Sequence, residues 1–353
     1  MSGTSARIDA LRHAAVTPLV SVLLASRDGA RYLQESLDSL AAQRYPEVEI
    51  VAVDDGSTDA TPEILARFAA RHGRTRVLRA EGEGLAAALH RAAGEASGTF
   101  FARQDDDDRS DPERFAKQVR FLHLHPEVGV VGTSATRIDA SGSTLGPYRV
   151  PLEVRQIAAA LRHSSPFVHG SVMMRREAYE RSGGYRAAFR AAQDVDLWLR
   201  MPPGAGLANL PEPLYAWREH PGGVFARARD QQLFYASVAR AFLEERAAGN
   251  AGDSVALLDR AETSEWFLEK YPLADRVKLH WGKLLVRLGR TAEARELLRA
   301  AGHSRRSTME SLLWRALGRA VTLSPRGFRA RDRARRRAED PGSVTPPPSV
   351  PPS

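Results

Sequence analysis

Apolar runs and segments of helical spacing alternate between Leu19 and Gly132. The run Leu19–Ala25 is typical of a strand covered on both faces, and the leucines of Ala30–Ala42 recur at helical spacing. Further strands are expected at Glu49–Val53, Val77–Leu78, Thr99–Ala102 and Gly129–Gly132. Further helices are expected from an N-cap at Thr61 to Gly73, from Leu85 to a stop at Gly94, and from a cap at Asp111–Glu113 to His123. This order predicts an α/β fold with a mostly parallel sheet and helices on both faces.

Two acidic clusters follow predicted strands directly. Asp54 and Asp55 end the second strand, and Asp105–Asp108 follow the fourth. Ligands of open α/β sheets bind beyond the carboxyl ends of the strands. The two clusters therefore predict one functional site at this edge of the sheet.

The run Gln104–Asp108 places four carboxylates side by side. Burying even two of them is costly unless a cation neutralises them. One interpretation is a divalent metal site that holds a diphosphate, because Mg²⁺ binds one or two carboxylates together with phosphate oxygens. The other is a solvated acidic loop that caps the helix at Asp111. The apolar strand directly before the run favours the metal site.

Composition narrows the class of protein. The chain of 353 residues has no cysteine, which excludes disulfides, thiolate catalysis and Cys-ligated zinc. The N-terminus lacks the apolar region of a secretory signal, and no apolar run approaches the roughly 20 residues of a spanning helix. A cytoplasmic protein is expected. The net charge of +8 is concentrated in the arginines between Arg326 and Arg337.

Four regions are expected along the chain. Residues 1–17 form a flexible arm, 18–250 the α/β domain, 251–323 an all-helical appendage and 324–353 a basic, Pro-rich disordered tail. Residues 284–298 resemble one tetratricopeptide-type hairpin, although stable arrays need about three such units. Residues 309–337 have two interpretations: an interfacial helix with a polybasic companion on the cytoplasmic face of the membrane, or a helix packed on the domain with a solvated tail.

Six motifs in order resemble those of the inverting family 2 glycosyltransferases, which have the Rossmann-like GT-A fold. The region that resembles the family is residues 18 to about 225. The matching segments are Ser21–Asp28 for S-V-I-I-P-T-Y-N, Val53–Asp59 for V-D-D-G-S-x-D, Gly84–His90 for G-x-a-x-a-x-N, Arg103–Asp108 for R-x-D-A-D-D, Gly183–Tyr185 with Gln193–Trp198 for G-G-Y and E-D-x-D-L-W, and Arg218–Gly223 for R-x-H-P-G. Each motif alone is weak; their order makes a chance match very improbable.

The resemblance implies a nucleotide site. Asp55 would accept a hydrogen bond from the nucleobase, with uracil as the expected base, and Asp54 would support it; the alternative for both is turn chemistry at Asp-Gly-Ser. Ser26 and Asp28 would line the base and ribose pocket, where Arg27 stands in place of the family's aromatic residue and could stack on the base. Asp105 would contact the ribose or a metal-bound water.

Arg103 would orient the acidic loop or touch a phosphate, with an ordinary surface arginine as the alternative. The resemblance further implies a divalent metal, Mg²⁺ or Mn²⁺, bound directly by Asp107. His220 would be the remaining metal ligand or a diphosphate contact, the alternative being a plain loop residue. Asp106 stands where the family often has alanine and is expected to point outward.

Asp194 is the expected catalytic base, which takes the proton of the acceptor hydroxyl as that hydroxyl attacks C1. The alternative is a helix N-cap ahead of Asp196. Gln193 replaces the family's usual glutamate, which puts in doubt any acceptor contact that needs this charge. The remaining histidines, His123, His163 and His169, have no matching motif and are expected to be structural.

Taken together, the motifs imply transfer of a sugar from a nucleotide-sugar donor, expected to be a UDP-sugar, to a glycan or lipid-linked acceptor in envelope or exopolysaccharide synthesis. A single sugar is expected, because the chain has no Q-x-x-R-W motif and no spanning helices. The alternatives are a nucleotidyltransferase, a non-catalytic scaffold on a transferase fold, or a nucleic-acid binder using the Arg-rich tail. The tail lacks interleaved aromatics apart from Phe328, so no nucleic-acid partner is expected.

Overall fold

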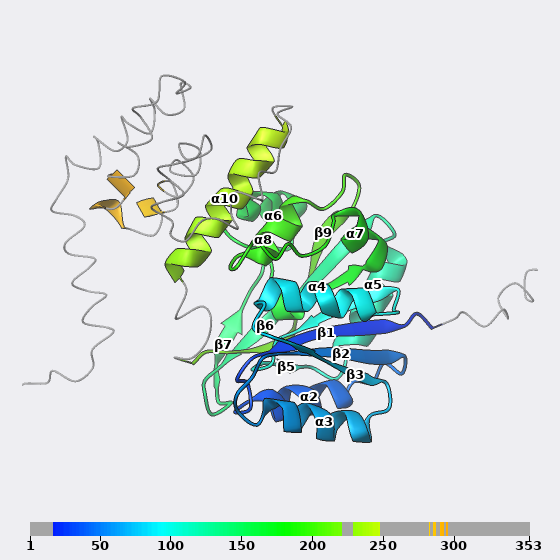
Figure 1. Cartoon of the computed structure of the whole chain (residues 1–353). Helices are drawn as coiled ribbons and strands as arrows, with labels where there is room; N and C mark the ends of the chain where they lie inside the picture. The colour runs from blue at the N-terminus through cyan, green and yellow to red at the C-terminus, as the bar shows by residue number, and fades with distance from the viewer. Residues whose placement is uncertain are drawn as a thin grey trace, which may run out of the picture. The chain divides into compact units, whose positions relative to one another are not determined.

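The computed structural model describes residues 17–220 and 229–247, with a few further residues between 282 and 295. In the described residues, one sheet has the strand order β3-β2-β1-β4-β8-β6-β9-β5, with β7 paired to β6 (Figure 1). The strands are β1 Val20–Ser26, β2 Val48–Asp55, β3 Thr75–Ala80, β4 Phe100–Gln104, β5 Arg109–Ser110, β6 Val128–Ile138, β7 Thr144–Tyr148, β8 Met173–Arg175 and β9 Gly206–Arg218. The helices are α2 Leu33–Ala41, α3 Thr61–Arg71, α4 Leu85–Glu95, α5 Arg114–Leu124, α6 Val154–Leu161, the 3₁₀ turn η1 His169–Ser171, α7 Arg176–Arg181, α8 Gln193–Leu199 and α10 Arg229–Ala247.

The first half of the sheet is parallel, as the alternation of strands and helices predicts. β1 lies between β2 and β4, β3 extends the sheet beyond β2, and all three pairings are parallel. β8 reverses this direction, because it pairs antiparallel with both β4 and β6. The carboxyl ends of β1, β2 and β4 consequently share one edge, so the two acidic clusters come together there.

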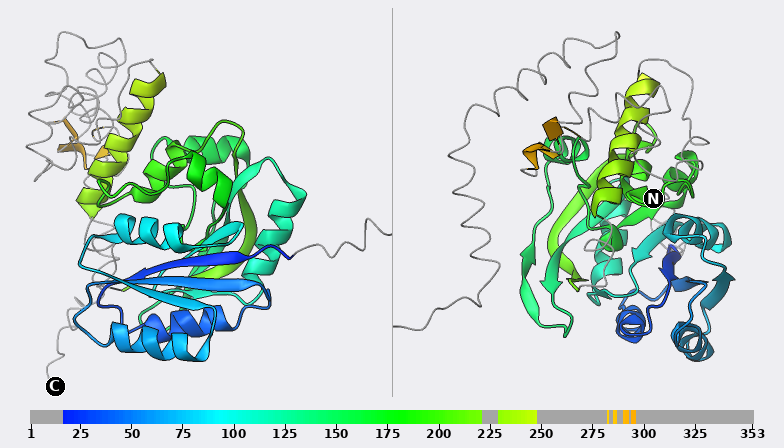
Figure 2. Two further views of the ribbon diagram at one scale, coloured as in Figure 1. Left: turned by 45° about the vertical axis from the view of Figure 1, so that its right-hand side comes forward. Right: turned by 60° about the vertical axis from the view of Figure 1, so that its left-hand side comes forward.

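Both faces of the sheet are covered by helices, as Figures 1 and 2 show. On one face, apolar residues of α2, α3 and α5 pack against Val22 and Leu24 of β1. On the other face, α4 and α8 pack against Leu23 and other strand residues. All seven residues of β1 are buried, which confirms the expected strand with two covered faces.

Several predicted helix ends are wrong by a few residues. Thr61, the predicted N-cap, is the first residue of α3, and Ala60 holds the cap position. The Thr61 backbone N–H donates to the Asp59 carboxylate at 2.9 Å, so Asp59 satisfies this free N–H at the start of the helix. α4 continues through Gly94 to Glu95, and α2 begins only at Leu33 after a turn. Helix ends are the least reliable part of a pattern-based prediction, since local side-chain contacts decide them.

The chain divides into two compact units, Met1–Tyr271 and Pro272–Ser353. α10 belongs to the first unit, where Phe242 lies 6.3 Å from Phe189 between ring centroids. Most of the predicted appendage and all of the tail lie outside the described residues, as does the arm up to residue 16. Among the described helices, none is long and apolar enough to cross a membrane.

Candidate active site at the carboxyl edge of the sheet

The acidic loop, residues 105–108, connects β4 to β5, and hydrogen bonds to buried side chains hold its backbone. The Tyr215 hydroxyl accepts the Asp105 backbone N–H at 3.1 Å. Gln104 is fully buried, and its amide donates to the carbonyls of Asp105 and Asp108 at 3.1 Å each. These bonds satisfy the backbone of a loop that leaves a buried strand, so its carboxylates are presented in fixed directions.

Each aspartate of the loop has a different partner. Asp105 pairs with Arg103 at 2.5 Å, and Asp106 accepts a bond from the Ser26 hydroxyl at 2.5 Å. Asp107 Oδ2 lies 2.9 Å from Nε2 of His220, and Asp108 accepts the Arg218 backbone N–H at 2.7 Å. The partners come from β1, β4, β9 and the segment after β9.

Asp106 does not point outward, contrary to the sequence-based expectation. Its carboxylate faces Ser26 and lies so close to Gly29 that a Cβ at Gly29 would collide with it. Burial and the charge of Asp107 raise the pKa of Asp106 to about 7. The reason is that the Ser26 hydroxyl at the end of β1 donates to Asp106 and draws its carboxylate toward the first loop.

Burial also raises the pKa of Asp107 and Asp108. For Asp107 the charge of Asp105 adds to this effect, while the His220 hydrogen bond opposes it. For Asp108 the next cause is the charge of Asp107. Carboxylates that repel one another in a buried loop form a site that a cation would stabilise.

The residues present fit a divalent cation in part. Asp107 and His220 place a carboxylate and an imidazole, both metal-ligand types, within 2.9 Å of each other. Within the described ranges, no three His, Asp or Glu side chains form a ready-made set of metal ligands. This is the arrangement expected where diphosphate oxygens complete the coordination sphere.

Arg218 is a site residue whose importance the motif alone did not indicate. Its side chain is fully buried; Nε donates to the Asp107 carbonyl at 2.7 Å, and Nη2 pairs with Glu35 at 2.7 Å. The guanidinium also lies over the Tyr32 ring, 4.5 Å from its centroid, and that ring is in edge contact with His220. Arg218 thus connects α2 to the acidic loop.

Arg103 is internal, so the surface alternative is wrong. It is 1% exposed and donates to Asp105, which supports its expected role in orienting the loop. Arg114 of α5 is equally buried and was not predicted. It donates to the Arg103 carbonyl at 2.6 Å and to the Ser110 hydroxyl at 2.6 Å, and burial lowers its pKa to about 10. Its position on the helical stripe of α5 gave no signal of this role.

The expected nucleotide residues gather beside the acidic loop. Asp54 accepts the Ser57 backbone N–H at 3.0 Å, which is the turn bond weighed as its alternative role. Asp55 accepts the N–H groups of Glu83 and Gly84 at 2.7 and 2.8 Å and so fixes the start of α4. A carboxylate offers about four lone-pair sites, which leaves Asp55 capacity for a nucleobase donor.

The first loop reaches the same place. Asp28 has a left-handed backbone with φ of 53°, and its carboxylate accepts the Thr58 N–H at 2.8 Å. Ser26 is buried against Asp106, and the exposed Arg27 lies over Gly82. β1, β2 and the segment before α4 therefore surround one region next to the acidic loop.

Asp194 lies in the first turn of α8 and is not its cap. The cap position is Ala192, which has a left-handed φ of 51° and makes no side-chain capping bond. Asp194 is half-buried, and its charge raises the pKa of His169, although burial is the larger effect and lowers it. The charges of Arg103 and Asp105 also act on His169. The His169 ring meets the Trp198 ring of α8 with centroids 6.3 Å apart, and the adjacent Gly170 lies against Asp105. His169 therefore lies between α8 and the acidic loop, a location the sequence did not indicate. The other two histidines without a family motif lie elsewhere: His123 is exposed, and His163 lies just after α6.

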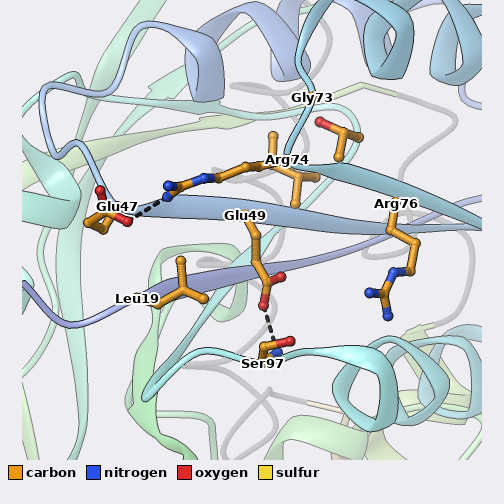
Figure 3. A pocket seen from close by; sticks show the side chains of 9 residues that line it. Leu19, Glu47, Glu49, Gly73, Arg74, Arg76 and Ser97 are labelled. Carbon is orange, nitrogen blue, oxygen red and sulfur yellow. Dashed lines mark hydrogen bonds and ion pairs between the residues drawn. The ribbon is translucent and has the colours of Figure 1, made fainter.

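A hollow at the opposite edge of the sheet does not contribute to this site. It lies at the amino ends of β1, β2 and β3 (Figure 3). Its charged side chains already have partners: Arg74 pairs with Glu47 at 2.5 Å, Glu49 accepts the Ser97 N–H at 2.6 Å, and Arg76 pairs with Glu95 at 2.8 Å. Because the acidic clusters lie at the other ends of the strands, the hollow is separate from them.

Comparison with known proteins gives consistent similarities. The sequence model of the family described as "Glycosyl transferase family 2" matches residues 21–183. EpsE of Bacillus subtilis (strain 168), itself provisionally named a glycosyltransferase, is 38% identical over 207 residues, which are 57% of this chain and 73% of EpsE. The amylovoran biosynthesis glycosyltransferase AmsE of Erwinia amylovora is 32% identical over 197 residues, 55% of this chain and 73% of AmsE.

Solved structures share the fold at low sequence identity. Residues 1–349 of S. aureus TarS, solved in complex with UDP-GlcNAc, superpose with a TM-score of 0.55 at 17% identity, covering 80% of this chain and 83% of that one. The mannosyltransferase PcManGT of Pyrobaculum calidifontis, in complex with GDP-Man and Mn²⁺, gives 0.50 at 20% identity, covering 89% and 82%. At these identities the similarity shows the fold alone.

Proposed function

Because the chain belongs to glycosyltransferase family 2 and has the GT-A fold, it is a glycosyltransferase, and we propose that it moves a single sugar from a nucleoside-diphosphate sugar to an acceptor hydroxyl with inversion at C1. One observation carries the proposal: the Asp107 carboxylate and the His220 imidazole lie 2.9 Å apart at the carboxyl edge of the sheet, where the acidic loop meets the segment after β9. The η1 turn lies between this loop and α8, because Gly170 lies against Asp105 and the His169 ring meets the Trp198 ring of α8 with centroids 6.3 Å apart. The helix that carries Asp194 is therefore packed close to the acidic loop.

The donor is proposed to be a UDP-sugar. Asp54 and Asp55, with Ser26 and Asp28 of the first loop, would hold the nucleoside, and Asp105 would contact the ribose. The structural neighbours support a nucleoside-diphosphate sugar as the donor class, since their titles name UDP-GlcNAc and GDP-Man. Uracil is the proposed base because the V-D-D-G-S segment resembles the family's nucleotide-binding motif, in which the counterpart of Asp55 would accept a hydrogen bond from the base.

In the transfer, the acceptor oxygen attacks C1 while Asp194 takes the hydroxyl proton. The bond from C1 to the diphosphate oxygen breaks, and its electron pair leaves with the diphosphate. Asp107 and His220 would hold a divalent cation, which when bound stabilises the charge of the leaving group. Arg103 and Arg218 keep the acidic loop in place through the bonds described above.

The acceptor is proposed to be a glycan or lipid-linked sugar of a bacterial envelope or exopolysaccharide. The support is similarity to AmsE, whose name states amylovoran biosynthesis. The O-antigen biosynthesis protein RfbC of Myxococcus xanthus is 31% identical over 206 residues, which are 57% of this chain but only 16% of RfbC. A cytoplasmic location is proposed with it, because nucleotide sugars would have to reach the donor site.

A donor screen tests this function. The full chain is incubated with UDP- and GDP-sugars plus Mn²⁺ or Mg²⁺, and release of nucleoside diphosphate by slow hydrolysis is measured. We expect one donor class to turn over, and the reaction to stop with EDTA. Asp194→Asn keeps the side-chain shape but cannot take the proton, so turnover should fall by on the order of 10²-fold or more with donor binding retained.

The matched control is Asp38→Asn, which alters a carboxylate on α2 whose hydrogen-bond partner among the described residues is Gln34 alone. It should turn over like the unaltered protein. Normal turnover in Asp194→Asn would rule out this residue as the base, and turnover unaffected by EDTA would rule out the metal.

A further inference from the structure

His169 and Tyr185 form a hydrogen-bonded pair next to the proposed base. Nε2 of His169 lies 2.8 Å from the Tyr185 hydroxyl, and the two rings meet edge to face with centroids 5.8 Å apart. The His169 ring also meets the Trp198 ring of α8 edge to face, with centroids 6.3 Å apart, and Asp194 lies one helical turn before Trp198 on the same side of that helix. Neither residue has a part in the donor site described above.

Both members of the pair are fixed by their surroundings. His169 begins the η1 turn, in which Gly170 has no room for a Cβ because the Tyr215 hydroxyl and Asp105 lie against it. Tyr185 is 2% exposed, and its backbone N–H donates to the Tyr179 hydroxyl at 3.2 Å. The pair is therefore built into the fold on both sides.

Burial and the neighbouring charges favour one protonation state of the pair. Burial raises the pKa of the Tyr185 hydroxyl, and the Arg103 charge opposes this only in part. The pKa is therefore well above its ordinary value, so the hydroxyl keeps its proton and can donate. Burial, assisted by Arg103, lowers the pKa of His169 and favours a neutral ring. A neutral ring that accepts at Nε2 carries its proton on Nδ1. In the part of the chain that is described, the ring makes no other hydrogen bond.

We propose that the His169–Tyr185 pair is a positioning unit for Asp194, in which the Tyr185 hydroxyl donates to Nε2 and holds the imidazole beside the base as an uncharged neighbour. This inference rests on the proposed function of Asp194. A protonated imidazole in the same place would attract the Asp194 carboxylate and weaken it as a proton acceptor. The groups that act on the ring are Arg103 from β4, Asp105 from the acidic loop, Asp194 from α8 and the Tyr185 hydroxyl.

Tyr185→Phe tests the pair by removing only the hydroxyl. Nε2 is then free to take a proton, so the His169 pKa should rise. We expect turnover of the donor found in the screen to fall about 10-fold, the acid limb of its pH profile to move to higher pH, and the donor Kd to stay within about twofold. His169→Gln removes the titrating ring, so it should lower turnover without moving the acid limb upward.

Tyr45→Phe is the matched control, because it removes a partly buried tyrosine hydroxyl that donates to the Pro18 carbonyl at 2.5 Å and supports neither His169 nor Tyr185. It should leave the acid limb unchanged. An equal shift in Tyr45→Phe, or no shift in Tyr185→Phe, overturns the inference.

Long-range ¹H–¹⁵N spectra of the histidine rings give a test that needs no turnover, with the His169 signal assigned by its loss in His169→Gln. We expect a neutral ring with the proton on Nδ1 at pH 7, and a lower His169 pKa in Asp194→Asn, because the opposite charge is removed. A ring protonated on Nε2, or a His169 pKa that ignores Asp194→Asn, refutes the pair. Loss of activity in Asp194→Asn is scored separately, so failure of the proposed function is distinguishable from failure of this inference.

Discussion

Asp105, Asp106, Asp107 and Asp108 carry the same side chain, yet each contacts a different part of the fold. Asp105 meets Arg103, Asp106 meets Ser26, and Asp107 meets His220. Asp108 instead accepts a backbone N–H and is 2% exposed. The neighbours, rather than the residue type, decide which carboxylate is free to bind a ligand: Asp107 is 27% exposed at its side chain and pairs with another ligand-type group.

Asp107→Ala tests that distinction. It removes the carboxylate proposed to bind the metal, whose stabilisation of leaving-group charge is worth several kcal/mol, so turnover should fall by on the order of 10²-fold or more. The thermal unfolding midpoint should not fall, since one of several mutually repelling carboxylates is removed. Asp38→Ala is the control. Full activity in Asp107→Ala would refute the metal site.

At the scale of elements, the short helix α8 carries Asp194 in its first turn, and ion pairs of the buried Asp196 carboxylate fix the position of this helix. Asp196 pairs with Arg200 at 2.7 Å and with Arg186 at a short contact, and its side chain is 2% exposed. Arg200 also donates to the carbonyls of Ser182 and Gly184. These contacts join α8 to the turn that carries Tyr185, and the Arg186 guanidinium extends over Phe242 of α10. The helix that carries the proposed base is thus fixed by its contacts with the Tyr185 turn and with Arg186, which also contacts α10.

Asp196→Ala should therefore destabilise the protein by about 3–5 kcal/mol, because it leaves the largely buried guanidinium groups of Arg186 and Arg200 without their buried carboxylate. Urea unfolding followed by circular dichroism measures this loss. The control is Glu180→Ala, which breaks the exposed Arg176–Glu180 pair and should cost no more than about 0.5 kcal/mol. A similar small loss for both variants would show that the pairs do not hold α8.

At the scale of the whole molecule, the catalytic unit and the basic C-terminal region make separate predictions. Residues 309–337 lie outside the described residues, so their two interpretations stay open. An interfacial helix with an Arg-rich companion predicts flotation with anionic liposomes that weakens with salt and disappears on truncation after Ser307. A helix packed on the domain predicts no flotation even at low salt. Neutral phosphatidylcholine vesicles serve as the control for the charge effect.

The sequence by itself determined the order of the elements and the edge of the sheet where the chemistry lies. An apolar run such as Leu19–Ala25 can be recognised from the sequence alone, because a strand covered on both faces is apolar throughout. The placement of Asp54, Asp55 and the acidic loop follows as well, because parallel neighbouring strands end at one edge. The motifs also indicated the Asp107 and His220 pair, which the structure brings within 2.9 Å.

Only the tertiary structure decided which side chains are buried and what they face. The inward direction of Asp106, the burial of Arg103 and Arg114, and the meeting of His169 with Tyr185 all depend on contacts between distant segments. The pattern along one element records its apolar face but not the partner of a polar group on it. A buried arginine or a neutral histidine is stable only through such partners, so their roles became visible only when the strands, turns and helices were placed together.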